Sequence, residues 1–99
     1  MGVRHVALFR FVEGTSDEHV RRIDEALAQL PEEILELRSY VFGRDLGVSG
    51  GAWDYGVVAD VTDVDAFVAY RDHPSHRRVV DDLIGPVVAE RASMQLATP

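Results

Sequence analysis

The sequence predicts an α+β domain in which a four-stranded antiparallel sheet carries helices on one face. Four segments alternate apolar and polar residues as strands do, and the segments between them repeat apolar residues at helical spacing. Glycine or proline separates most of these segments. Their order is β, α, β, β, α, β, with the last helical part broken in two. This is the split βαβ, ferredoxin-like arrangement.

Composition limits the classes of partner. The 99 residues, 46% of them hydrophobic, are expected to form one domain spanning residues 1–99. Ten basic and seventeen acidic side chains give a net charge of −7, which argues against a nucleic-acid partner. The absence of cysteine excludes disulfides and thiolate metal sites. No apolar run reaches ~18 residues and no signal peptide is seen, so we expect a cytoplasmic protein without a membrane partner.

The first strand is predicted over residues 3–12, and both of its faces are substantially apolar. One face carries His5 together with Val3, Ala7, Phe9 and Phe11. After Gly14, a capping box of Thr15 and Glu18 is expected to start a helix that ends before Pro31. Its apolar face contains Val20, Ile23, Leu27 and Leu30, and His19 is expected on the solvated side.

Residues 35–46 and 53–61 are predicted as the second and third strands, joined by a flexible turn over residues 47–51. Tyr40, Phe42, Trp53 and Tyr55 are expected to pack in the core or at a dimer face. Residues 87–96 are predicted to form the last strand.

Asp63 or Asp65 can cap a short helix that carries Tyr70 and ends at His73. Pro74 disfavours helical geometry at His73, and Ser75 is then a possible cap for a new helix over residues 75–84. In that helix His76, Val80 and Leu83 share one face. The His76 ring is therefore expected to point inward, toward a candidate pocket that His5 approaches from the first strand.

A second expectation concerns the other face of the sheet. Val6 and Leu8, with half of each remaining strand, would stay in water, which is a larger apolar patch than soluble monomers usually expose. Pairing two sheets face to face removes this exposure, so we predict a two-fold homodimer that encloses a barrel-like core.

Several short motifs along the chain form a familiar set: His5 in a strand ending Phe9-Arg10-Phe11, Gly43-Arg44-Asp45, Trp53-Asp54-Tyr55, Tyr70 with His73-Pro74-Ser75-His76, and Pro86. With the element order, this set resembles the stress-responsive dimeric α/β barrel (Dabb) family over essentially the whole chain. The resemblance implies a dimeric barrel and a small cavity between the sheet and the helices of each subunit.

The best understood activity of that family is that of olivetolic acid cyclase, which needs no cofactor and closes a linear polyketide thioester by aldol chemistry. The resemblance implies that His76 and Tyr70 match its working pair and that His5 matches a further pocket histidine. Leu27 and Val57 stand where the cyclase has a tyrosine and a histidine, so a different substrate is expected. Residues expected to contact the substrate are Phe9, Leu27, Tyr55, Val57 and His73.

The first hypothesis is therefore a cofactor-free lyase or cyclase for a small keto or phenolic compound, with His76 as general base and Tyr70 as its partner. The second is a non-catalytic dimer that binds a small apolar or aromatic ligand or serves in a stress response, with structural histidines. A cofactor-independent monooxygenase is a third, by analogy of fold alone. No zinc-type spacing of histidines is present, and neither a metal nor haem is expected.

Overall fold

The computed structural model describes all 99 residues, which form four strands and three helices with a short π-helical turn. In chain order these are β1 (Gly2–Phe11), α1 (Asp17–Glu33), β2 (Ser39–Arg44), β3 (Tyr55–Val61), α2 (Val64–Asp72), α3 (Pro74–Val79), the π-helical turn η1 (Val80–Ile84) and β4 (Val88–Thr98). The order is the one that the sequence predicts. None of the helices combines the length and apolar character that crossing a membrane requires.

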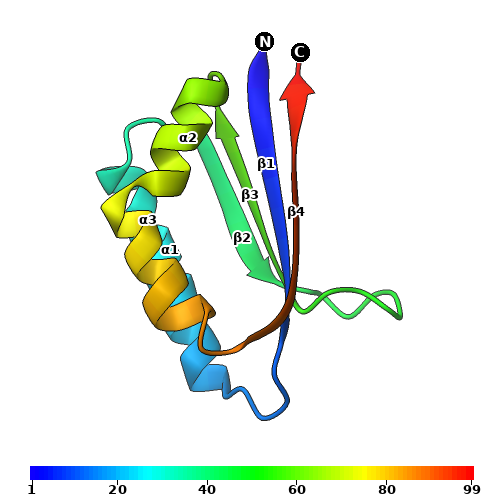
Figure 1. The fold of residues 1–99 in the computed structure, drawn as a ribbon. Helices are drawn as coiled ribbons and strands as arrows, with labels where there is room; N and C mark the ends of the chain where they lie inside the picture. The colour runs from blue at the N-terminus through cyan, green and yellow to red at the C-terminus, as the bar shows by residue number, and fades with distance from the viewer.

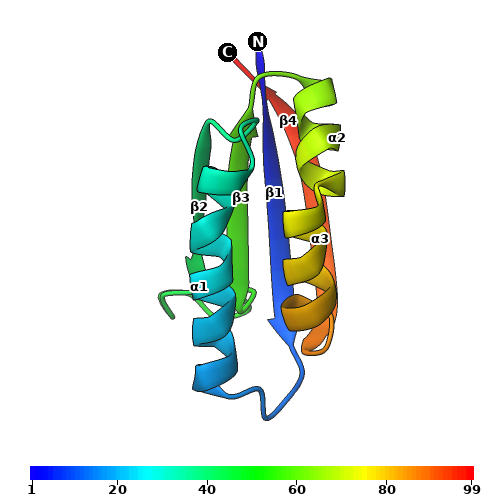
Figure 2. The same cartoon turned by 90° about the vertical axis from the view of Figure 1, so that its left-hand side faces the viewer.

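The strands form one antiparallel sheet in the order β2-β3-β1-β4. Figure 1 shows all the helices on one side of this sheet, and Figure 2 shows α1 running beside α2 and α3 in the covering layer. The two ends of the chain lie close together at one end of the sheet (Figure 1). The ferredoxin-like fold predicted from the sequence is therefore confirmed.

The core lies between the helix layer and the two central strands, β1 and β3. Successive strand residues point to opposite faces, so one set from each strand meets the helices. The α1 side chains that face them are at most 2% exposed, and burying each aliphatic one contributes about 1.5–3 kcal/mol. The residues of this core include Ala7, Phe9, Val20, Ile23, Leu27, Leu30, Tyr55, Val57 and Ala59.

Both ends of α1 differ from the prediction. Ser16 is the N-cap, its hydroxyl accepting a hydrogen bond from the His19 amide at 3.1 Å, while the Thr15 hydroxyl donates to the Val12 carbonyl. The helix also continues through Pro31 to Glu33. Proline removes only one helical hydrogen bond, and the Ile34 amide still donates to the Leu30 carbonyl at 2.8 Å. Burial of the Leu30 and Ile34 side chains explains why the last turn persists.

The second strand is shorter than predicted. It starts at Ser39 because residues 34–38 turn, with the Leu37 amide donating to the Ile34 carbonyl and the Leu35 side chain exposed. At its other end, residues 45–54 form a loop that projects past the sheet on the side away from the helices (Figure 1). The third strand begins at Tyr55 rather than Trp53, and the last one runs on to Thr98.

The junction between α2 and α3 is made by His73 and Pro74. The Nδ1 atom of His73 accepts a hydrogen bond from the Ser75 amide at 3.1 Å, so His73 and not Ser75 caps the new helix. Pro74 occupies its first turn, where the missing N–H costs nothing. The His73 backbone is not helical, as expected before a proline.

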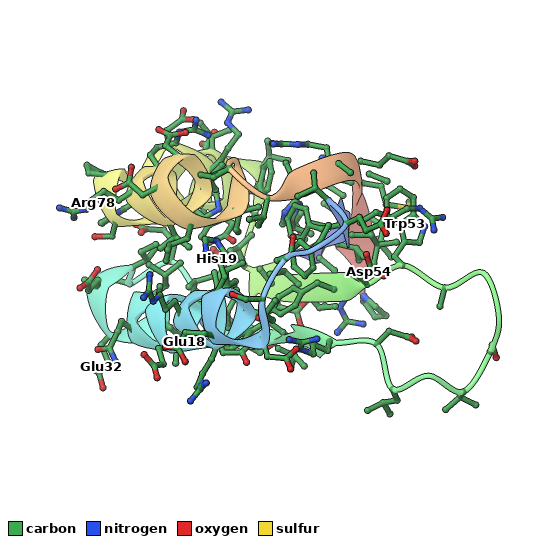
Figure 3. All side chains as sticks on the ribbon, turned by 90° about the horizontal axis from the view of Figure 1, so that it is seen from below. Glu18, His19, Glu32, Trp53, Asp54 and Arg78 are labelled. Carbon is green, nitrogen blue, oxygen red and sulfur yellow. The ribbon has the colours of Figure 1, made fainter.

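The predicted helix over residues 75–84 changes to a π-helical turn at Val80. The Gly85 amide donates to the Val80 carbonyl five residues back, at 2.7 Å. The His19 ring, labelled in Figure 3 between the two helical segments, donates from Nε2 to the Leu83 carbonyl at 2.7 Å. The prediction that His19 is solvated was wrong, because α1 packs close enough to η1 for the ring to reach its backbone.

The sheet face opposite the helices has no cover within one chain. Its central row is formed by Val41, Val58, Val6 and Met94, which lie opposite one another across the four strands. Val41 and Met94 are 65% and 57% exposed, respectively. Two ion pairs, Arg4 with Asp60 at 2.8 Å and Arg10 with Glu90 at 3.4 Å, lie on the same face. This surface, which we call the open sheet face, matches the apolar face expected from the sequence.

Candidate functional site

A cavity of about 150 Å³ lies between the sheet and the segment formed by α2, α3 and η1. Its apolar walls come from Ala7, Phe9, Leu27, Val57, Val80, Ile84 and Ala92. Polar groups come from His5, Tyr40, Tyr70, His76, Arg77, Arg91 and Ser93. The volume is close to that of a cavity of about 150 Å³ known to hold a benzene ring, so the occupant expected here is small.

The structure brings together six of the eight residues that the sequence predicts for the site. His5, Phe9, Leu27, Val57, Tyr70 and His76 all line the cavity. Tyr55 and His73 do not. The Tyr55 hydroxyl turns toward α1 and donates to Asp24 Oδ1 at 2.5 Å, while the His73 ring is used as the helix cap.

A second hollow, of about 500 Å³, lies between the end of β1 and the 45–54 loop, near Trp53 and Asp54 in Figure 3. It is lined mainly by polar and exposed residues, and none of the predicted site residues borders it. The smaller cavity is therefore the better candidate site.

The His76 ring is held in one orientation by the backbone. Its Nδ1 atom lies 2.9 Å from the Arg71 carbonyl oxygen, which only accepts hydrogen bonds, so Nδ1 carries a proton. In the neutral ring Nε2 is then unprotonated and is the atom available to accept a proton. Burial lowers the pKa of His76 below its usual value, and the nearby Arg77 charge acts in the same direction. The ring is consequently neutral at physiological pH.

Tyr70 lies against this ring, with centroids 4.3 Å apart, and its side chain is almost fully buried. Its hydroxyl oxygen is 2.9 Å from that of Tyr40, so one of the two donates to the other. Burial raises the pKa of Tyr70 to about 12 and also raises that of Tyr40. Both phenols therefore remain protonated and are hydrogen-bond donors within the cavity.

His5 completes this side of the site from β1. Its ring contacts Phe67 and Tyr70, with centroid distances of 5.0 and 6.1 Å. Its Nδ1 atom lies 2.6 Å from the Gln95 side-chain oxygen on β4. Burial lowers the pKa of His5, although the bond to Gln95 opposes that effect. Two neutral imidazoles and two phenols thus border one small, largely apolar space.

Sequence reasoning did not place Tyr40, Arg77, Arg91 or Ser93 in the site. Tyr40 has a signal in the sequence, since a tyrosine on the buried face of a strand needs a hydroxyl partner. Arg91 and Ser93 follow from the sheet register, which places them opposite Phe9 and Ala7 on the helix-facing side of β4. No three His, Asp or Glu side chains are grouped closely enough in this structure to hold a metal ion.

Comparisons with known proteins agree with this architecture. A protein of Thermobifida fusca, described as a dimeric ferredoxin-like protein of unknown function, is 44% identical, covers 99% of this chain and 92% of its own, and superposes with a TM-score of 0.92. An uncharacterized protein of Streptomyces coelicolor is 29% identical over 77 residues, which are 76% of this chain and 79% of that protein.

A hydroxynitrile lyase of Passiflora edulis has a TM-score of 0.85 over 99% of this chain and 94% of the lyase. Its sequence is 16% identical, so the likeness is one of fold. The profile of the stress responsive A/B barrel domain, Dabb, matches residues 3–96. Because that match spans nearly the entire sequence, this chain belongs to the stress responsive A/B barrel domain family.

Proposed function

We propose that the protein is a cofactor-free lyase or cyclase for a small keto or phenolic compound. The observation that carries the proposal is the His76 ring, whose Nδ1–H is bound to the Arg71 carbonyl and which lines the cavity beside Tyr70. In this arrangement the His76 Nε2 atom can act as a base and the Tyr70 hydroxyl can act as a hydrogen-bond donor in the same cavity. A general base of this kind contributes about 10²–10⁴-fold to a rate.

In the proposed step, His76 Nε2 takes a proton from a carbon next to the substrate carbonyl. The electron pair of the broken C–H bond moves into the enolate, whose oxygen accepts a hydrogen bond from the Tyr70 hydroxyl. Tyr40 supports this role when its hydroxyl donates a hydrogen bond to the Tyr70 oxygen, because the Tyr70 O–H is then free to donate to the substrate. The same base and donor serve lyase or aldol chemistry.

The second candidate is a binding protein that holds a small apolar or aromatic ligand without chemistry. The largely aliphatic and aromatic wall of the cavity favours it, as does the hydrogen bond that each half-buried imidazole already makes to the protein. Satisfied buried histidines are common structural features. The fold shared with a hydroxynitrile lyase supports the enzyme, while these hydrogen bonds are compatible with both.

We also propose that the protein is a homodimer joined through the open sheet face. The Thermobifida fusca relative, 44% identical, is described as dimeric. Face-to-face pairing would cover the row from Val41 to Met94, which one chain leaves in water. The 45–54 loop projects on that same side, and its Leu46 and Val48 are 90% and 84% exposed. A partner subunit would bury these side chains as well.

An exchange experiment tests the enzymatic proposal without knowledge of the natural substrate. Acetophenone is incubated in D2O with the full chain, and loss of its methyl proton signal is followed by NMR. We expect exchange faster than in matched buffer, strongly reduced in His76→Ala and reduced in Tyr70→Phe. His73→Asn, which keeps the cap and removes an imidazole outside the cavity, is the matched control.

Two results would contradict the enzyme. One is exchange that equals the buffer rate, and the other is exchange that is the same in the wild type and His76→Ala. If acetophenone still shifts cavity resonances in either case, the binding protein is the better description. A wild-type rate that falls as pH drops through the lowered pKa of His76 supports the base, because only the neutral ring accepts a proton.

A further inference from the structure

The cavity has an uneven charge distribution that the proposed function does not use. Two arginines line it, Arg77 from the helix layer and Arg91 from β4, and no aspartate or glutamate does. This contrasts with the chain as a whole, in which seventeen acidic residues outnumber ten basic ones. The two histidines of the cavity add no charge at physiological pH, because burial lowers the pKa of both. The positive charge at the cavity comes from the arginines.

The sheet register gives Arg91 its position. Residue Arg91 lies opposite Phe9, whose side chain is part of the core beneath the helices, so both point to the helix side of the sheet. The preceding residue, Glu90, points to the other face and pairs with Arg10. Along the helix side of β4 the next residues are Ser93 and Gln95, opposite Ala7 and His5. The edge strand therefore gives the cavity a polar wall.

Arg91 also lacks the partner that most arginines of this chain have. Seven arginines pair with a carboxylate, namely Arg4, Arg10, Arg21, Arg22, Arg44, Arg71 and Arg77. Arg91 makes no ion pair and no side-chain hydrogen bond, and of the three unpaired arginines it alone lines the cavity. Arg77 is bound only to Asp81, at 3.0 Å in an exposed pair of the kind that contributes little. Both guanidinium groups are thus available to an anion.

We infer that the cavity takes a small organic carboxylate, with its carbon skeleton among Phe9, Leu27 and Val57 and its carboxylate at Arg91, assisted by Arg77. The planar guanidinium fork matches the two oxygens of a carboxylate. A cavity of about 150 Å³ has room for one ring or a short branched chain. This inference rests on the proposed function, whose substrate class it narrows to a keto acid or an aromatic acid.

The test uses benzoate and its neutral, nearly isosteric amide, benzamide, as probes of the full chain. Each is titrated at constant ionic strength while the NMR signals of Leu27, Val57 and His76 are followed. The wild type is compared with Arg91→Gln and with Arg78→Gln. Arg78 is the matched control, because it carries the same charge on α3 but lies on the outer side of the helix layer (Figure 3) and does not line the cavity.

We expect benzoate to shift these signals saturably and to bind more tightly than benzamide. Arg91→Gln should weaken benzoate binding by about tenfold or more, the usual size of a hydrogen bond to a charged group, and leave benzamide binding unchanged. Arg78→Gln should leave both unchanged. Because Arg91 is exposed, its substitution is expected to leave the fold intact, which the unchanged remainder of the spectrum would verify.

Equal affinity for the two probes, with no effect of Arg91→Gln, would overturn the anion site. Failure of benzoate to shift any cavity signal would also overturn it. An equal loss of benzoate affinity in Arg78→Gln would do the same, because the effect would then come from net charge alone. Acetophenone has no charge, so its exchange by His76 does not depend on Arg91. The carboxylate inference and the proposed function can therefore fail separately.

Discussion

Tyr70 and His76 lie with their rings 4.3 Å apart, although a helix break separates them in the chain. In one continuous helix, residues six positions apart would point roughly 120° away from each other around the axis. The His73 cap and Pro74 stop α2 and start α3, and this change of direction brings the two rings onto the same wall. The proline break is thus the feature of the sequence that makes the site.

The bond from His76 to the Arg71 carbonyl is expected to stabilise the junction. His76→Ala removes the donor and the ring packing on Tyr70, and should lower the free energy of unfolding by about 1–2 kcal/mol. His76→Asn keeps an N–H near the position of Nδ1 and should lose less. Chemical denaturation of both variants checks this. A neutral or stabilising His76→Ala would show instead that the half-buried ring is kept at a cost to stability.

Stability should fall in mildly acidic solution. Burial lowers the folded-state pKa of His5 and His76 below the unfolded value of about 6.5, so the unfolded chain binds protons more readily. The contribution of the two neutral rings to the free energy of unfolding is complete above the unfolded pKa. It is lost as pH falls from there through the lowered folded-state pKa values. Denaturation between about pH 8 and pH 5 should show the loss, and a His5→Gln, His76→Asn double variant should flatten it.

The carboxylates of Asp60 and Asp72 do not account for that change. The pKa values of Asp60 and Asp72 lie below their usual value of 3.8, because Arg4 and Arg71 hold the charged forms by hydrogen bonds. Their protonation therefore begins in more acidic solution than that of the histidines. An equal slope in the wild type and in the double histidine variant would assign the effect to other groups.

The hydroxyl pair of Tyr40 and Tyr70 should show as coupling between two substitutions. Tyr40→Phe and Tyr70→Phe each remove one side of a partly buried hydrogen bond and should each cost about 1 kcal/mol of unfolding free energy. The double variant leaves no hydroxyl without its partner and should cost less than the sum. Denaturation of all four proteins gives the cycle. Strict additivity would mean that the pair contributes nothing.

The open sheet face should control assembly. Val58→Lys places a charge at the centre of the row formed with Val6 and Val41, and should convert a dimer into a monomer at micromolar concentration. Val64→Lys, at a 62% exposed position on α2, is the matched control and should remain dimeric. Analytical ultracentrifugation distinguishes the outcomes. A wild type that sediments as a monomer would exclude the proposed dimer.

The sequence determined the order of the elements and most of the core, because side-chain periodicity is a local property. The spacing of Val20, Ile23, Leu27 and Leu30 requires a helix with one buried face, and the structure buries all four. The helix break at Pro74 and the inward direction of His76 also follow from local sequence. Six of the eight predicted site residues line the cavity.

Only the tertiary structure decided which residues from distant segments meet there. Tyr40 and Tyr70 are thirty positions apart, and the His19 ring reaches a carbonyl sixty-four positions away. The strand register alone sets Arg91 beside Phe9 and Gln95 beside His5. Such pairings depend on how the strands and helices align in space, which the pattern within one segment does not encode. The sequence thus determined that an inward-pointing histidine borders a pocket, and the packing determined which groups surround it.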